Sequence, residues 1–252
     1  MRLKWFLCGS LLLALACQKS TPGSNNDNGN SNGRIVKLEQ DGDQLKVNYR
    51  NDGKIDNMVV IYGNGSSQTY QFSYQAGVLS QVDFGGKWKY YYSGTQLIKV
   101  ETYNASNALR YRYDYTYTDN KLSGCLQTLI NGTLEFPFMK FGFDYGADGN
   151  LQKKTTFQYI NQQWKQSEAC TYTGYDTHAN VLEPFENLPY LPADMYSPNN
   201  PLKETWLDDQ GAVNTVVTHQ YSYDDQSRVK SRKSFFHITG FPDSTAEIKV
   251  YY

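Results

Sequence analysis

The residue types that most often perform catalysis or bind metals are few in this chain, and they are scattered. Its three histidines are His178, His219 and His237. The chain lacks the His-Glu-x-x-His pair of zinc proteases, the Cys-x-x-Cys pair of redox and zinc sites, and the Gly-x-Ser-x-Gly turn of serine hydrolases. These patterns favour a protein that is not an enzyme.

Acidic residues in predicted turns could supply oxygen ligands to calcium at Asp41-Gly42-Asp43, Asp208-Asp209 and Asp224-Asp225. None of these pairs has the spacing of a known calcium loop, and turn aspartates usually accept hydrogen bonds from their own backbone. We therefore expect neither a metal nor a cofactor. The chain has 25 Asp and Glu residues, so a glycosidase pair stays open, but the sequence selects no pair.

The aromatic residues are the clearest excess, at 15% of the chain with 22 tyrosines. Seven of the tyrosines lie beside predicted turns at regular spacing, which favours rings that cover the sheet rather than bind a ligand. Better candidates for contact with a glycan or a peptide are the aromatic residues outside that pattern. These are Trp88, Trp164, Trp206, Tyr190 and Tyr196.

The turn tyrosines define a repeat. In its first form a tyrosine and an aliphatic residue lie five apart, as in Tyr74 with Leu79, Tyr92 with Leu97 and Tyr117 with Leu122. In a hairpin with a two-residue loop, this spacing makes the two residues directly opposed partners on one face of the sheet. The predicted loops are Ala76-Gly77, Gly94-Thr95 and Asp119-Asn120.

In the second form the spacing is six, and one extra loop residue restores the same pairing. The pairs are Tyr49 with Ile55, Tyr145 with Leu151, Tyr175 with Val181 and Tyr223 with Val229. Gly53 and Gly149 fall at the third loop position, where a left-handed residue is needed. Further turn signals lie between these hairpins, so the pattern predicts an antiparallel meander of about sixteen strands.

The pattern has two irregularities. The alternation slips between Phe136-Pro137-Phe138 and Phe141-Gly142-Phe143, which predicts a β-bulge near Met139-Lys140. Residues 183–202 hold five of the eight prolines and interrupt the meander. An irregular segment of this length either binds something or caps an open end of the sheet.

The N-terminal segment precedes the predicted fold. Arg2 and Lys4 come before an apolar run that ends in Ala14-Leu15-Ala16-Cys17. This ending resembles the lipobox of bacterial lipoproteins, which implies that residues 1–17 are a signal peptide and that Cys17 carries the lipid. A plain secretory signal or a short membrane anchor are the alternatives. Residues 18–33, rich in Asn, Gly and Ser, are typical of a tether.

The positions of the cysteines and the net charge restrict which disulfide and which binding partners are expected. Cys125 and Cys170 fall on predicted strands separated by two others, about 14 Å apart, whereas a disulfide needs Cα atoms within about 7 Å. We expect two buried free thiols unless barrel closure brings them together. Without residues 1–17 the formal net charge is −3, and no basic block stands out, so nucleic acid is not an expected partner.

The hairpin pattern resembles the YD repeat of Rhs and teneurin-type proteins, and Tyr175-Asp176 and Tyr223-Asp224 carry the dipeptide itself. With the export signal and the Asn-rich tether, the chain looks like a Bacteroides-type lipoprotein family of unknown function. The resemblance implies one continuous antiparallel sheet that coils into a half-pipe or open barrel. It implies no catalytic residues, and most of the tyrosines lack the following Asp.

These observations predict an all-β protein whose single domain, residues 34–252, follows the signal peptide and the tether. The expected function is that of an exported, lipid-anchored binding or scaffold protein at the outer membrane, facing the periplasm or the cell surface. A transmembrane β-barrel and a surface enzyme acting on glycans are the alternatives.

Overall fold

The protein, seen in a computed structural model, is described for residues 33–182 and 197–252, which form sixteen strands and no helix. Within these ranges there is accordingly no helix of the length and apolarity that a membrane crossing requires. The strands are β1 (Lys37–Gln40), β2 (Asp43–Tyr49), β3 (Ile55–Ile61), β4 (Ser67–Gln75), β5 (Val78–Asp83), β6 (Lys87–Ser93), β7 (Gln96–Tyr103), β8 (Leu109–Thr118), β9 (Lys121–Asn131), β10 (Leu134–Tyr145), β11 (Leu151–Ile160), β12 (Gln163–Ala179), β13 (Asn199–Leu207), β14 (Val213–Tyr223), β15 (Val229–Ile238) and β16 (Ser244–Tyr251).

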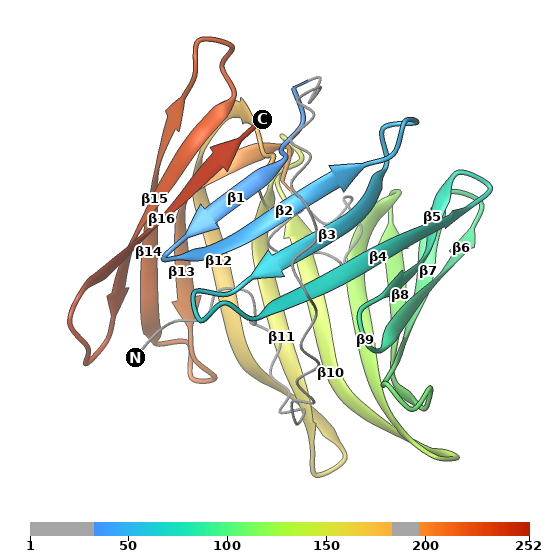
Figure 1. Ribbon diagram of the computed structural model, residues 1–252. Helices are drawn as coiled ribbons and strands as arrows, with labels where there is room; N and C mark the ends of the chain where they lie inside the picture. The colour runs from blue at the N-terminus through green and yellow to red at the C-terminus, as the bar shows by residue number, and fades with distance from the viewer. Residues whose placement is uncertain (1–32, 183–196) are drawn as a thin grey trace.

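The strands form a closed barrel (Figure 1). Each strand pairs antiparallel with its neighbours in the chain, and β1 pairs with β16 through Leu38 and Val250. The sequence predicted the meander and the number of strands, but a half-pipe or open barrel rather than a closed one. Closure gives a partner to the backbone groups of β1 and β16, which would otherwise form two exposed edges.

The predicted hairpins are present at one end of the barrel, which we call the tyrosine end. The three two-residue loops are those expected, and Ala76, Asp119 and Asn120 adopt positive φ angles of 49°, 51° and 61°. In the three-residue loops the third position is also left-handed, with Ser227 taking the place of the usual glycine. The tyrosine and the aliphatic residue are directly opposed in every predicted pair but one.

The exception is Tyr175. The sequence predicted a turn at Thr177-His178-Ala179 with Tyr175 opposite Val181, and this is wrong. Strand β12 continues to Ala179, and Tyr175 pairs instead with Pro201 on β13. The loop lacks the left-handed residue found at the other three-residue turns, so nothing local stops the strand there.

The irregularities lie close to where the sequence placed them. The register between β9 and β10 shifts between Pro137 and Met139, so the bulge is one or two residues before the predicted position. Strand β13 begins at Asn199, inside the predicted insertion of residues 183–202. Residues 183–196 lie outside the described residues.

At the tyrosine end, hydroxyl groups of six tyrosines donate to backbone carbonyls earlier in the chain, and we call these bonds the hydroxyl ladder. Tyr74 Oη donates to the carbonyl oxygen of Ile55 at 3.0 Å, and Tyr117 Oη donates to that of Leu97 at 2.8 Å. In both cases the acceptor is the aliphatic partner in the preceding hairpin. Tyr49, Tyr175, Tyr221 and Tyr252 make equivalent bonds to the carbonyls of Ile35, Leu151, Pro201 and Val229.

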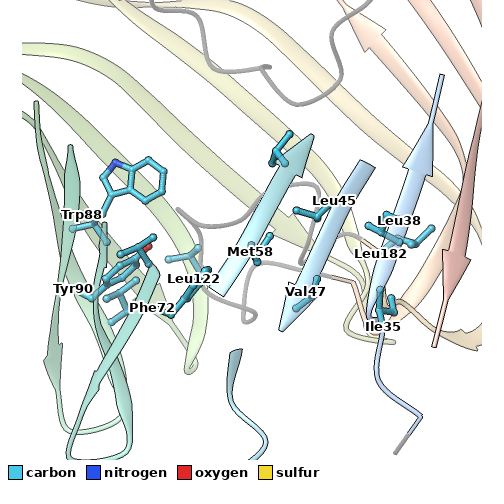
Figure 2. Packing of buried hydrophobic residues seen from close by; sticks show 14 of the residues in the cluster. Ile35, Leu38, Leu45, Val47, Met58, Phe72, Trp88, Tyr90, Leu122 and Leu182 are labelled. Atoms are coloured by element: carbon cyan, nitrogen blue, oxygen red, sulfur yellow. The ribbon is translucent and has the colours of Figure 1, made fainter. Parts of the chain in front are cut away.

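The core lies on one face of the sheet. Figure 2 shows this row of buried apolar side chains running from Ile35 and Leu38 to Trp88 and Tyr90. Side chains converge on the concave face of a curved sheet and diverge on the convex face, so this buried face is the barrel interior. Tyrosine rings such as Tyr70 and Tyr74 pack against the aliphatic residues and shield them from water.

The outward face is polar. Lys89 and Glu101 are directly opposed there on β6 and β7, and Arg112 faces Glu101 from β8. Arg112 also forms an ion pair with Glu135 at 2.8 Å. The convex surface therefore carries charges and hydroxyl groups where the concave surface carries the core.

Candidate ligand-binding site in the barrel interior

The barrel interior is divided into an apolar part and a polar part. The apolar core is richest on β1 to β9, whereas the middle of strands β11 to β15 presents ionisable and hydrogen-bonding side chains on the same face. The register fixes this orientation, because Lys154 is opposite the buried Phe143 and Arg232 is opposite the buried Ile248. We call this surface the polar wall, and its residues are Lys154, Glu168, Glu204, Trp206, His219 and Arg232.

A hydrogen-bonded chain forms the centre of the polar wall. His219 is 4% exposed, and its Nε2 atom lies 3.2 Å from Glu204 Oε1. Its Nδ1 atom lies 2.9 Å from Ser234 Oγ. Trp206 Nε1 donates to the other carboxylate oxygen of Glu204 at 3.0 Å. Four strand-borne side chains are thus held in one orientation.

The electrostatics of these hydrogen-bonded side chains keep Glu204 ionised. Burial alone would raise the pKa of Glu204, but the hydrogen bond and charge of His219, together with the charge of Arg232, outweigh burial and lower it. A carboxylate with these partners is an acceptor near neutral pH. The polar wall can therefore offer the half-buried Glu204 carboxylate and Lys154 ammonium to the same ligand, whereas His219 and Arg232 are buried.

The contact between serine, histidine and carboxylate is not arranged for hydrolysis in this conformation. Ser234 is only 2% exposed, which leaves no room for a substrate carbonyl beside its Oγ. Burial also raises the pKa of the Cys125 and Cys170 thiols well above the ordinary value. Both cysteines are free and buried, as expected for strands β9 and β12 with β10 and β11 between them.

The predicted ligand residues occupy three different environments. Trp206 is partly exposed on the polar wall. Trp88 is 4% exposed and packs against Phe84 with ring centroids 4.0 Å apart, so its ring is part of the core and is not available to a ligand in this conformation. Trp164 lies beside Tyr159 at the β11–β12 turn, with ring centroids 5.0 Å apart, far along the strand from Trp206. Tyr190, Tyr196 and Cys17 lie outside the described residues.

A second polar cluster holds the ends of the interrupted hairpin at the tyrosine end. Asp176 accepts hydrogen bonds from Asn200 Nδ2 at 3.1 Å and from the Tyr223 hydroxyl. The His178 ring stacks on Tyr223 with centroids 3.8 Å apart. Ser197 Oγ accepts a hydrogen bond from the Leu151 backbone at 2.9 Å. This clasp fixes the positions from which residues 183–196 depart and return.

Of the polar wall, sequence reasoning named only Trp206 as a ligand candidate, and it did not find the clasp. The polar-wall residues lie on separate strands, and only the pairing of β11 to β15 brings them together. The Tyr-Asp dipeptide at Tyr175-Asp176 was a usable signal for the clasp, because the same Asp176 that matches the repeat is the acceptor at its centre. A shallow cavity of about 480 Å³ at the β2–β3 turn, lined by Tyr49, Arg50, Asn51, Asp52 and Asp56, was not expected either.

Comparison with known proteins identifies similar structures but no family. No protein-family model matches the chain, and no curated protein does. The barrel is similar to the crystal structure of a porin-like protein from Bacteroides uniformis ATCC 8492. The TM-score is 0.60 at 14% identity, over 86% of this chain and 97% of that chain. At this identity the similarity shows the fold alone.

Two more distant similarities are also to Bacteroides proteins. A porin-like protein from Bacteroides vulgatus ATCC 8482 matches with a TM-score of 0.48 at 14% identity, over 86% of this chain and 98% of that one. A protein of unknown function from Bacteroides fragilis NCTC 9343 matches with a TM-score of 0.36 at 11% identity, over 56% of this chain and 95% of that one.

Proposed function

We propose that this protein is a non-enzymatic, lipid-anchored barrel of the bacterial cell envelope, and that it binds a polar ligand against the polar wall of its interior. The observation that carries the proposal is the unequal interior. One part is a packed core, whereas the other keeps charged groups and a partly exposed indole in fixed positions. Such an indole, beside a carboxylate and basic groups, suits the apolar faces and hydroxyl groups of a sugar, so we favour a glycan over a peptide.

The porin-like description of the Bacteroides uniformis protein favours a second candidate, a barrel that spans the outer membrane. Such barrels present an apolar band about 25 Å tall to the lipid. The outward Lys89, Glu101 and Arg112 lie on strands of 7, 8 and 10 residues, which a band of that height would have to cover almost completely. This surface favours a barrel in water.

Solubility separates these two candidates. Residues 20–252, produced without the signal peptide, should purify as a folded β-protein without detergent. A chain that folds only in detergent or lipid would support the membrane-spanning candidate and contradict our proposal.

The ligand site is tested by a glycan and peptide binding screen on the same chain. Trp206→Ala should lower affinity for a glycan found in the screen at least tenfold, because the ring supplies the stacking surface. Trp164→Ala is the matched control, since it removes an indole that is remote from the polar wall. Equal losses in both variants, or none in either, would contradict a site at the polar wall.

The predicted insertion is tested separately. Replacing residues 184–196 with a Gly-Ser loop of equal length keeps Ser197 and Asn200, which the clasp needs. If Tyr190 and Tyr196 also contact the ligand, as the sequence predicts, affinity falls while the unfolding temperature stays near that of the parent. Unchanged affinity would exclude both tyrosines.

The proposed lipid anchor requires the thiol of Cys17. Labelling cells with a radioactive fatty acid should mark the parent protein and not Cys17→Ser, because the thiol is the proposed acceptor. Label on the variant would contradict lipidation at this residue.

A further inference from the structure

The end of the barrel opposite the tyrosine end has an apolar half. Among the described residues, six of the nine exposed large apolar side chains lie at or beside the four consecutive turns from β9 to β16. These turns line the lower side of the barrel in Figure 1. We call this surface the apolar half-rim, and its residues are Leu134, Phe136, Tyr159, Ile160, Val213 and Phe241.

The other half of the same rim is different. Its turns are built from Asp41-Gly42, Gly63-Asn64-Gly65, Gly85-Gly86 and the segment from Asn104 to Ala108. No exposed large apolar side chain lies at those four turns in the described chain. The contrast within one rim shows that hairpin turns here do not need exposed apolar residues in order to form.

The residues of the apolar half-rim are held at the ends of paired strands. Phe241 is 60% exposed at the β15–β16 turn, and that turn is joined to the β13–β14 turn by a hydrogen bond from the Thr239 amide to the Asn214 carbonyl at 2.9 Å. At the β11–β12 turn the Tyr159 ring lies against Trp164. The apolar groups are therefore carried on a supported edge rather than on single loose loops.

We propose that the apolar half-rim docks on a lipid bilayer, with its side chains inserted at the level of the headgroups. The geometry points to a membrane rather than to a protein groove, because the side chains stand on four separate hairpin ends and follow one edge. Aromatic and aliphatic residues in such positions are typical of proteins that lie at a membrane interface. With a formal net charge of −3 beyond residue 17, apolar insertion and not attraction to acidic lipid would drive the contact.

Chain length allows this contact together with the proposed anchor, on which the inference rests in part. The chain enters the barrel at the tyrosine end, where Tyr49 bonds to Ile35. A segment as long as residues 18–33 can span at most about 55 Å, whereas a twelve-residue strand spans about 40 Å. Both a lipid on Cys17 and the apolar half-rim can thus reach one bilayer.

The test uses the chain from Gln18 to Tyr252 without lipid, so its outcome does not depend on lipidation at Cys17 or on a ligand in the interior. The probe is vesicles of phosphatidylcholine, which carry no net charge. We expect binding that changes little between 50 mM and 500 mM salt, and quenching of Trp164 fluorescence by lipids brominated on their acyl chains.

The double variant Phe136→Ser, Phe241→Ser should lower the partition coefficient at least tenfold while the circular dichroism spectrum is unchanged. Ile98→Ser is the matched control, because Ile98 is similarly exposed but lies on β7 near the tyrosine end. Absence of vesicle binding by the parent chain would overturn the proposal. So would a dimer in sedimentation experiments that the double variant abolishes, because the half-rim would then bind a second copy.

Discussion

At the scale of single residues, the tyrosine hydroxyls do more than the sequence indicated. The repeat predicted only that each ring packs across from an aliphatic residue. In the structure Tyr74 also hydrogen-bonds to the previous hairpin, so its side chain links three consecutive strands. Burial raises the pKa of Tyr49 and of Tyr74 to about 12, which keeps both hydroxyls protonated as donors at physiological pH.

Removing one of these tyrosine hydroxyl bonds should measurably lower the free energy of unfolding. Tyr74→Phe keeps the ring and deletes the bond to the Ile55 carbonyl, so the free energy of unfolding should fall by about 1 kcal/mol. Urea denaturation measures this change. Tyr251→Phe removes a hydroxyl that bonds to Glu39 at the surface and should leave the free energy of unfolding nearly unchanged. Equal effects of the two changes would argue against a structural role for the ladder.

Glu101 provides a pH-dependent prediction on the outward face. Burial opposes its charge, but hydrogen bonds from Lys99, Tyr91 and Tyr103 lower its pKa to about 2. Because the folded-state pKa lies below the unfolded value, the stabilisation is present above about pH 4.5 and is lost as the pH falls toward 2.

The corresponding measurement compares Glu101→Gln with the parent protein. At pH 7 the variant should be less stable by roughly 1 kcal/mol after allowance for solvent screening. The difference should shrink steadily below pH 4.5. A difference that does not depend on pH would mean that the side chain acts through packing and not through its charge.

At the scale of elements, the turns were the most predictable part of the chain. Loop length followed from the tyrosine spacing alone, because an antiparallel pair leaves no other register. The hairpin at Tyr175 was mispredicted, because the repeat spacing was present there without the turn chemistry. Trp88 and Trp206 looked alike in sequence. The side chains packed around each ring, which the sequence does not reveal, distinguish the core residue Trp88 from Trp206 on the polar wall.

The Ala76-Gly77 turn offers a stabilising substitution. Ala76 has a φ of 49°, a conformation that costs a residue with a Cβ atom about 1 kcal/mol relative to glycine. Ala76→Gly should therefore raise the free energy of unfolding by about 0.5 kcal/mol, once the greater freedom of glycine in the unfolded chain is allowed for. Thermal unfolding is a suitable measurement.

Thr95 is the control for this prediction. It occupies the second loop position of another two-residue turn, but its φ is not positive. Thr95→Gly should lower stability, because it adds unfolded-state freedom without relieving strain. Stabilisation by both glycines would show that backbone strain is not the cause.

At the scale of the whole molecule, closure distinguishes a barrel from the curled sheet that the sequence predicted. Local spacing cannot predict it, because β1 and β16 are the two strands farthest apart in the chain and their pairing leaves no repeat signal. Leu38 and Val250 are opposed at this seam, and both are buried. The seam is short, so its strength depends on a few side chains.

Opening the seam should change the state of association. Val250→Asp places a charge among apolar groups and should destabilise the protein by at least about 3 kcal/mol, with higher oligomers in gel filtration, because freed strand edges pair with other molecules. Lys249→Asp, one residue earlier and exposed on the outer face, should leave the barrel monodisperse. Identical behaviour of the two variants would contradict a closed barrel.

The strand order also has a consequence for folding kinetics. Apart from the β1–β16 seam, every strand pairs with its immediate neighbours in the chain, and the hydroxyl bonds of Tyr74 and Tyr117 also reach only the preceding hairpin. Contacts of this kind have low contact order, so hairpins can be added one after another as the chain becomes available. The seam can form only after β16 has been synthesised. Until then one edge of β1 has no strand partner and can pair with another molecule. Pairing of β16 with β1 should therefore be the slowest folding step, and the intermediate that precedes it should be the state most prone to aggregation.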